Sequence, residues 1–437
     1  MIKDLFKKIM SNKIWLILII IIGFRGIVYS FYNEVSIYPD TFSYVNFNEN
    51  ILKGEVDALR TPVYPYIIKF ITLLDKSATL YVNITNLQEI VSLASVIILY
   101  TTLKKTMKNQ VANYFATLVY GCLPAIFTYN RVILTESLSI SLYVMYFCLI
   151  IQYLKSSTLS KAITLSIFTF LLIMLRPSFL YLLLVLSIMF LLVFILKKED
   201  RISAIYGSIA LVGVISCILG YSYLNKKQNG YFAISSVTQI NQLDNVINLR
   251  IYDTRDEQDR GIIDIISEWK DGYNGPWYRQ TTEQIMTNFT VEEVDSFLNR
   301  CVRNNFLQYI KGTIQKVIDL QFEPCDEIYL SAKETVIIQP MIYFIVIFIY
   351  VIYDSIYILI QTIKNKKLAL VQTILLIAIL GQLATVIVGA QAEYSRLFMP
   401  ALPIVVISFA WNIDDILEKT KKVDSKQQEG ENKDERN

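Results

Sequence analysis

The chain has 437 residues, of which 54% are hydrophobic, and its formal net charge at pH 7 is +3. A soluble domain of this length is rarely so apolar, and the small net charge gives no sign of a nucleic-acid-binding surface, so no nucleic-acid partner is expected. The chain contains no histidine, which excludes the commonest general base and the commonest zinc ligand.

Ten apolar stretches are candidates for membrane-spanning helices. In chain order they are residues 14–32, 80–103, 110–129, 136–154, 162–175, 177–196, 202–224, 335–362, 368–389 and 397–416. The first lacks a small-residue cleavage site, so we expect it to be an uncleaved span. The fifth and sixth are separated only by Arg176 and Pro177.

The basic residues of the short loops predict the orientation. Lysines precede the first span and recur in alternate loops, at 104–108, 155–161, 197–201 and 364–367. The opposite short loops carry one arginine each, namely Arg131, Arg176 and Arg396. We therefore expect a multi-pass cell-membrane protein with both termini in the cytoplasm.

Two long segments are then predicted to lie outside, residues 33–79 and 225–334. Within the first, the 13 apolar residues of 62–74 are too few to span a bilayer, so we expect an interfacial helix there. The second has about 110 residues, enough for a small α or α/β domain. Two of its cysteines, Cys301 and Cys325, are candidates for a disulfide.

The predicted fold class is an all-α polytopic membrane protein with about ten transmembrane helices, interfacial helices in the first external loop and a small external domain. The chain divides into an N-terminal membrane module (1–224), the extracytoplasmic domain (225–334), C-terminal membrane helices (335–416) and a cytoplasmic tail (417–437). The polar end, 423–437, is expected to be disordered.

Ionisable residues gather at the predicted external ends of the spans, where they are candidates for function. Asp40 and Arg60 follow the first span. The other candidates are Tyr44 beside them, Arg131 and Glu136 before the fourth span, Arg176 between the fifth and sixth, Glu393 and Arg396 before the tenth, and Arg25 within the first. The external short loops use arginine alone, whose planar fork suits bidentate contact with phosphate.

The predicted cytoplasmic segments are too short to bind a nucleotide sugar, and no Gly-rich phosphate loop is present. If the protein is a transferase, its donor must reach the outer face through the membrane, and a polyprenyl-phosphate sugar fits this requirement. An acceptor hydroxyl then needs a base, for which we predict Asp40. The departing phosphate needs fixed cations, for which we predict Arg60, Arg176 and Arg396.

The first external loop resembles that of the integral-membrane glycosyltransferases of the GT-C superfamily, family 39 type, such as the protein O-mannosyltransferases and the lipid A aminoarabinose transferase. The likeness lies in Asp40 with Tyr44, then ILKGE (51–55) and RTPVYP (60–65). Three more segments match in the same order, NRVILTESL (130–138), LRPSFL (175–180) and EYSRLFMPALP (393–403), so the likeness extends over residues 20–410.

This resemblance implies a GT-C-like fold and a hexosyl transfer from polyprenyl phosphate, generally with inversion. It implies Asp40 as the catalytic carboxylate and Arg60 as the cation of the family's basic-Pro-Pro segment. That segment is Arg-Thr-Pro here, and Thr41 follows Asp40 where protein mannosyltransferases have a glutamate. The external DxD of metal-dependent relatives is missing, so neither a metal nor another cofactor is predicted.

The acceptor stays open among a cell-envelope glycan, a lipid and a protein. Two other functions are compatible with the sequence: a flippase or transporter of lipid-linked sugars, and a lipid-linked polysaccharide polymerase. Transporters tend to place charges near the middle of the membrane on broken helices, with inverted repeats. Polymerases more commonly carry their arginines in a large external loop, whereas here the arginines lie in the short turns.

Overall fold

The computed structural model describes residues 13–31, 35–74, 79–272, 277–319, 338–365, 368–389 and 394–434. Every regular element in these ranges is a helix. Their only β contact is an isolated parallel bridge between Ser36 and Val132.

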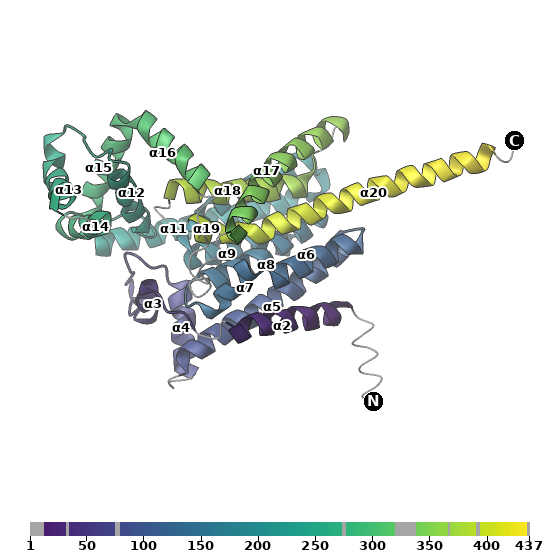
Figure 1. The fold of residues 1–437 in the computed structure, drawn as a ribbon, viewed down its shortest axis with the longest axis horizontal. Coiled ribbons are helices and arrows are strands. Elements are labelled where there is room, and N and C mark those ends of the chain that lie inside the picture. Colours follow the sequence, from purple (N-terminus) through teal and green to yellow (C-terminus); the bar gives the residue numbers. More distant parts are fainter. Residues whose placement is uncertain are drawn as a thin grey trace.

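Long apolar helices run roughly alongside one another through most of the molecule (Figure 1). They are α2 (Lys13–Phe31), α5 (Leu80–Thr106), α6 (Gln110–Cys122), α8 (Glu136–Lys155), α9 (Leu159–Leu175), α10 (Leu182–Leu196), α11 (Arg201–Asn229), α17 (Ile338–Asn365), α18 (Leu370–Gly389) and α20 (Leu402–Asp434). Eight helical segments in the described ranges are long and apolar enough to cross a membrane. The protein is a multi-pass all-α membrane protein, and the predicted fold class is confirmed.

The ten predicted spans are all helical where the structure describes them, but two differ from a straight crossing. Residues 110–129 form α6 followed by the short α7 (Pro124–Phe127), and the pair is bent by 50°. Leu123 has extended backbone, as expected before a proline, and this interrupts the helix. Helix α9 has 17 residues, slightly short of a full crossing, and packs between α8 and α11.

The polar C-terminal end is helical rather than disordered as far as the structure describes it. Helix α20 continues through Asp434, well beyond its apolar part. The expectation of disorder from 423 was therefore wrong for residues 423–434. Lysine, glutamine and glutamate are good helix formers, no proline interrupts this stretch, and Lys419 pairs with Asp415 one turn earlier at 2.7 Å.

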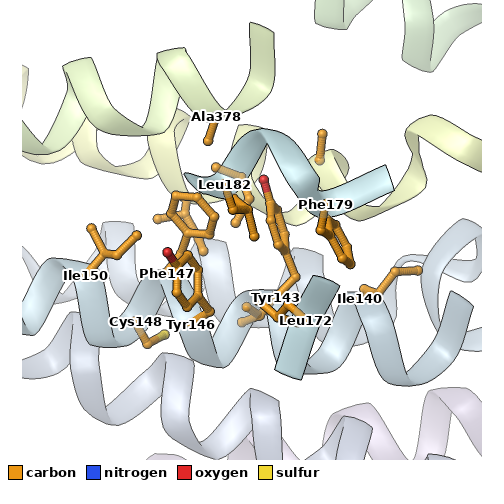
Figure 2. Packing of buried hydrophobic residues seen from close by; sticks show 14 of the residues in the cluster. Ile140, Tyr143, Tyr146, Phe147, Cys148, Ile150, Leu172, Phe179, Leu182 and Ala378 are labelled. Carbon is orange, nitrogen blue, oxygen red and sulfur yellow. The ribbon is translucent and has the colours of Figure 1, made fainter. Parts of the chain in front are cut away.

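Aromatic side chains fill the centre of the bundle. Tyr143 and Phe147 of α8 and Phe179 of the 3₁₀ helix η3 (Pro177–Tyr181) are completely buried, and they lie together in Figure 2. The rings of Tyr143 and Phe179 are stacked with centroids 5.0 Å apart, and the hydroxyls of Tyr143 and Tyr181 are 2.6 Å apart in a hydrogen bond. These contacts fix η3, and the adjoining Arg176, against α8.

Helix α18 approaches η3 so closely that only glycine fits at the contact. A Cβ on Gly381 would lie 2.5 Å from Cδ2 of Tyr181. We expect Gly381→Ala to destabilise the protein by about 1–3 kcal/mol through overpacking, seen as a lower midpoint of thermal unfolding in detergent. Gly213→Ala is the matched control, because nothing lies within 4 Å of its added Cβ. Equal midpoints for the two variants would contradict this packing.

Two groups of shorter helices lie at one end of the bundle (Figure 1). The first group is α3 (Pro39–Val45), η1 (Ile51–Lys53) and α4 (Val63–Leu74). The second is α12 (Val237–Asn248), η5 (Glu257–Asp259), α13 (Arg260–Gly272), α14 (Trp277–Asn288), α15 (Val291–Asn304) and α16 (Phe306–Asp319). The second group, called the outer helical cluster below, has its own hydrophobic core around Leu243, Ile266 and Phe297.

Candidate functional site

A cavity of about 1150 Å³ lies between the helix bundle and the outer helical cluster. Its wall on the bundle side comes from α3, the segment before α4, the start of α8, the turn from α9 to η3, the end of α18 and residues 396–397. Its opposite wall comes from residues 235–244 and 282–287. Six of the predicted site residues line this one space: Asp40, Tyr44, Arg60, Glu136, Arg176 and Arg396.

Asp40 and Arg60 form an ion pair at one side of the cavity. Arg60 Nη2 donates to Asp40 Oδ1 at 2.7 Å, and the side chains are 46% (Asp40) and 16% (Arg60) exposed. Arg60 also donates from Nε to the Ser43 hydroxyl at 2.7 Å and from Nη1 to the Tyr44 hydroxyl at 3.2 Å. The guanidinium is therefore held by three partners of helix α3, and Asp40 keeps an accessible carboxylate.

The surroundings keep Tyr44 and Arg60 in defined protonation states. Burial raises the pKa of Tyr44, so its phenol keeps its proton. Burial alone would lower the pKa of Arg60, but the neighbouring Tyr44 and Asp40 outweigh it, and the pKa of Arg60 is raised. Arg60 also lies over the Tyr44 ring, with Cζ 4.6 Å from its centroid. Arg60 is a permanent cation here, and Tyr44 can donate a hydrogen bond into the cavity.

Backbone contacts fix helix α3 relative to the start of α8. Ser36 N donates to Arg131 O at 2.9 Å, and Ile133 N donates to Ser36 O at 3.3 Å. The Thr41 hydroxyl donates to Ile133 O at 2.9 Å. Because Thr41 follows Asp40 directly, these bonds hold Asp40 against the loop that leads into Glu136.

Glu136 lies between two guanidinium groups in the wall of the cavity. Its Oε1 is 3.4 Å from Arg176 Nη1 and 3.5 Å from Arg396 Nε, and its side chain is only 4% exposed. The position in the first turn of α8 also favours a carboxylate. The three residues come from three distant parts of the chain. They meet because α8 packs against α9, which ends just before Arg176, and against η6 (Met399–Ala401), which packs on α19 (Tyr394–Phe398), the helix of Arg396.

Nη1 of Arg176 has no hydrogen-bond partner among the described residues. Arg176 Nη1 is buried and makes no hydrogen bond, although Glu136 lies 3.4 Å away. Burying a guanidinium nitrogen in this way is costly, and such groups are rare in folded proteins. Among the described residues of the bundle-side wall, three guanidinium groups face two carboxylates, which leaves one positive charge in excess.

Two predicted candidates do not line the cavity. Arg25 is buried inside the bundle, where Nη1 pairs with Glu89 at 2.8 Å and Nε donates to Gly121 O at 2.9 Å. Arg131 lies over the Tyr29 ring, with Cζ 4.6 Å from its centroid. The Tyr29 hydroxyl also donates to Glu89, so this network gives Arg25 a structural partner, whereas the role of Arg131 stays a prediction. Glu393 and the pairing of Cys301 with Cys325 fall outside the described residues.

Arg25→Lys separates a structural role from a site role. Lysine keeps the charge but loses the fork that reaches Glu89 and Gly121 O together. We expect a loss of about 1–3 kcal/mol in stability, because a hydrogen-bonded carbonyl is left without its donor. Thermal unfolding in detergent measures this loss. Activity per folded molecule should not change, and a loss of activity without loss of stability would assign Arg25 to the site.

The sequence did not reveal the wall formed by α12 and α14. Asp244, Thr282 and Glu283 line the cavity from this side. They lie in ordinary amphipathic helices without a motif, so the only available signal was the length of the segment. Across the described ranges, no group of three aspartate, glutamate or cysteine side chains is arranged to hold a metal ion.

No family model matches the chain, and no curated protein matches it. Among solved structures, the chain is similar to archaeal oligosaccharyltransferase AglB from Archaeoglobus fulgidus in complex with an inhibitory peptide and a dolichol-phosphate, at 10% identity over 88% of this chain and 46% of that one, with a TM-score of 0.44. It is also similar to the Archaeoglobus fulgidus oligosaccharyltransferase tethered with an acceptor peptide (10% identity, 85% and 44% covered, TM-score 0.45) and in the apo form (9%, 88% and 46%, 0.45).

The chain therefore spans less than half the length of these solved structures. At this identity and TM-score the likeness says nothing about activity.

Proposed function

We propose that the protein is a membrane glycosyltransferase that moves one sugar, of hexosyl type, from a polyprenyl-phosphate donor to an extracytoplasmic acceptor, with inversion. The observation that carries the proposal is the make-up of the cavity. Three guanidinium groups and the carboxylates of Asp40 and Glu136 meet on the bundle-side wall, and a buried nitrogen of Arg176 makes no hydrogen bond to a described residue. A phosphate bound between the guanidinium groups would satisfy that nitrogen and balance the excess positive charge of the bundle-side wall.

The proposed step gives each residue a separate task. The acceptor oxygen attacks the anomeric carbon while its proton passes to Asp40. The bond between the anomeric carbon and the phosphate oxygen breaks, and its electron pair stays with the phosphate, which gains one negative charge. Arg176 and Arg396 stabilise that charge together with Arg60. Glu136 keeps the guanidinium groups of Arg176 and Arg396 apart and oriented.

The surroundings of the cations suit a lipid-linked donor. Ala384, Val386 and Val388 at the end of α18 line the cavity together with Leu180 of η3. This apolar surface continues into helices that are long enough to cross a membrane. We assign the sugar and phosphate to the polar part of the cavity and the first isoprene units to the apolar part.

The distribution of lysine supports an outward-facing cavity. The cavity lies at the start of α8 and the end of α18. Lys155 lies in the last turn of α8, and Lys364 lies in the last turn of α17, which precedes α18 in the chain. Lysine-rich helix ends face the cytoplasm in membrane proteins. In this orientation the donor headgroup and the acceptor meet on the extracytoplasmic side.

Transfer of a labelled sugar tests the proposal against its alternatives. Purified full-length protein is given a radiolabelled polyprenyl-phosphate hexose together with crude cell-envelope material. Movement of one labelled sugar onto an acceptor supports the transferase. Translocation of the donor in liposomes without transfer would favour a flippase, and growth of lipid-linked chains would favour a polymerase.

A further inference from the structure

The cavity wall formed by the outer helical cluster differs in charge from the wall opposite. Its polar side chains are hydroxyls, an amide and carboxylates: Ser235, Thr238, Asn241, Asp244, Thr282, Glu283 and Thr287. No lysine or arginine is among the described residues of this wall. The three described guanidinium groups of the cavity all come from the bundle side. An anionic ligand would therefore bind at the bundle-side wall, and a neutral or cationic ligand at the wall of the outer helical cluster.

Hydrogen bonds hold this wall in place. The Asn241 side chain donates to Gly389 O at the end of α18 at 3.0 Å. The Ser235 hydroxyl donates to Leu59 O at 2.7 Å, next to Arg60. Thr282 donates its hydroxyl to Asp244, and both side chains are buried. The wall is therefore tied to the parts of the bundle that carry Arg60 and the apolar end of α18.

We propose that this wall is the acceptor subsite and that it takes a glycan end that is neutral or carries an ammonium group, in preference to a polyol phosphate. This inference rests on the proposed transferase function. Sugar hydroxyls and ammonium groups can donate hydrogen bonds to Asp244 and Glu283. A phosphate next to the reacting hydroxyl would face the two carboxylates, whose charge has the same sign, and would be repelled.

The geometry also defines where the two substrates lie relative to each other. The donor phosphate lies against Arg176 and Arg396, and the acceptor lies against α12 and α14. Asp40 lies on the bundle-side wall of the same cavity, with its side chain 46% exposed. The hydroxyl that loses its proton then faces Asp40 while the rest of the acceptor contacts the outer helical cluster.

Binding to the full-length protein in nanodiscs tests this inference. Four probes are used: a tetramer of glucosamine, its N-acetylated neutral counterpart, a glycerol-phosphate tetramer, and a polyprenyl phosphate as the donor-site probe. We expect the amino tetramer to bind at least about tenfold more tightly than the glycerol phosphate. Glu283→Gln should weaken binding of the amino tetramer by about fivefold, a modest loss because solvent partly screens the charge of Glu283. Binding of the neutral tetramer should change less.

The controls separate this inference from the proposed function. Glu257→Gln changes an exposed carboxylate of the same helical cluster outside the cavity, and it should leave all four affinities unchanged. Three results would overturn the acceptor subsite. Glycerol phosphate could bind as tightly as the amino tetramer or more tightly, Glu283→Gln could bind the amino tetramer with wild-type affinity, or the protein could bind polyprenyl phosphate but neither sugar probe. Failure of polyprenyl phosphate to bind the wild type would overturn the transferase, and the subsite with it.

Discussion

Asp40→Asn is expected to lower the rate constant of sugar transfer by about 10²–10⁴, the usual contribution of a positioned general base. Asparagine can still accept the hydrogen bond that Arg60 Nη2 makes to Asp40 Oδ1, so the ion-pair geometry is largely kept. It cannot take a proton from the acceptor. Polyprenyl-phosphate binding should therefore stay within about twofold of wild type while turnover is lost.

The matched control for this variant is Glu55→Gln. Glu55 is an exposed carboxylate of the same segment, bonded to Asn50 N at 3.1 Å and outside the cavity lining. It should transfer sugar at the wild-type rate. If Asp40→Asn and Glu55→Gln were equally active under saturating donor, Asp40 would not be the base.

Arg176→Gln is expected to reduce kcat/KM for the donor by about 10²–10³, comparable to removing a single donor that stabilises charge in a transition state. Arg176 lies next to Glu136, is 8% exposed, and contributes the buried nitrogen without a hydrogen bond. Glutamine removes the charge and the fork, so both donor affinity and stabilisation of the leaving phosphate are lost. Arg176→Lys keeps the charge and should recover part of the activity.

Arg131→Gln serves as the control for Arg176→Gln. Arg131 is also an arginine of a predicted external turn, but it packs on the Tyr29 ring and is not part of the cavity lining. Its loss should leave the KM for the donor unchanged. A similar loss for both variants would mean that general electrostatics, rather than contact with the phosphate, controls donor use.

Much of the fold could be predicted because its signals are local. Apolar stretches of about 20 residues predict spans wherever no proline interrupts them, and they failed to predict a straight crossing only at Pro124 and in the short α9. The polar residues after 423 gave a composition that suits either a disordered tail or a solvated helix, and the helical propensity of lysine and glutamate was the signal that was missed.

The gathering of Asp40, Arg60, Arg176 and Arg396 could be predicted because membrane topology sorts residues by side. Charged residues at helix ends on one side of a membrane bundle share a small area. Once the membrane orientation is known, we therefore expect them to lie close together. The roles assigned to them stay predictions. Arg25 carried the same signal but is explained by Glu89, an acid in the next span whose pairing depends on helix rotation. The wall of α12 and α14 depends on tertiary packing of segments without motifs, which a single sequence does not reveal.

The most direct test of the account is an experimental structure of the protein with a polyprenyl phosphate bound. The account predicts the phosphate within hydrogen-bond distance of Arg176 and Arg396, and the isoprene chain leaving the cavity along the end of α18. Asp40 should face the side of the phosphate that the sugar would occupy. A phosphate bound elsewhere on the protein, with Arg176 Nη1 still without a partner, would contradict the proposed donor site and the mechanism built on it.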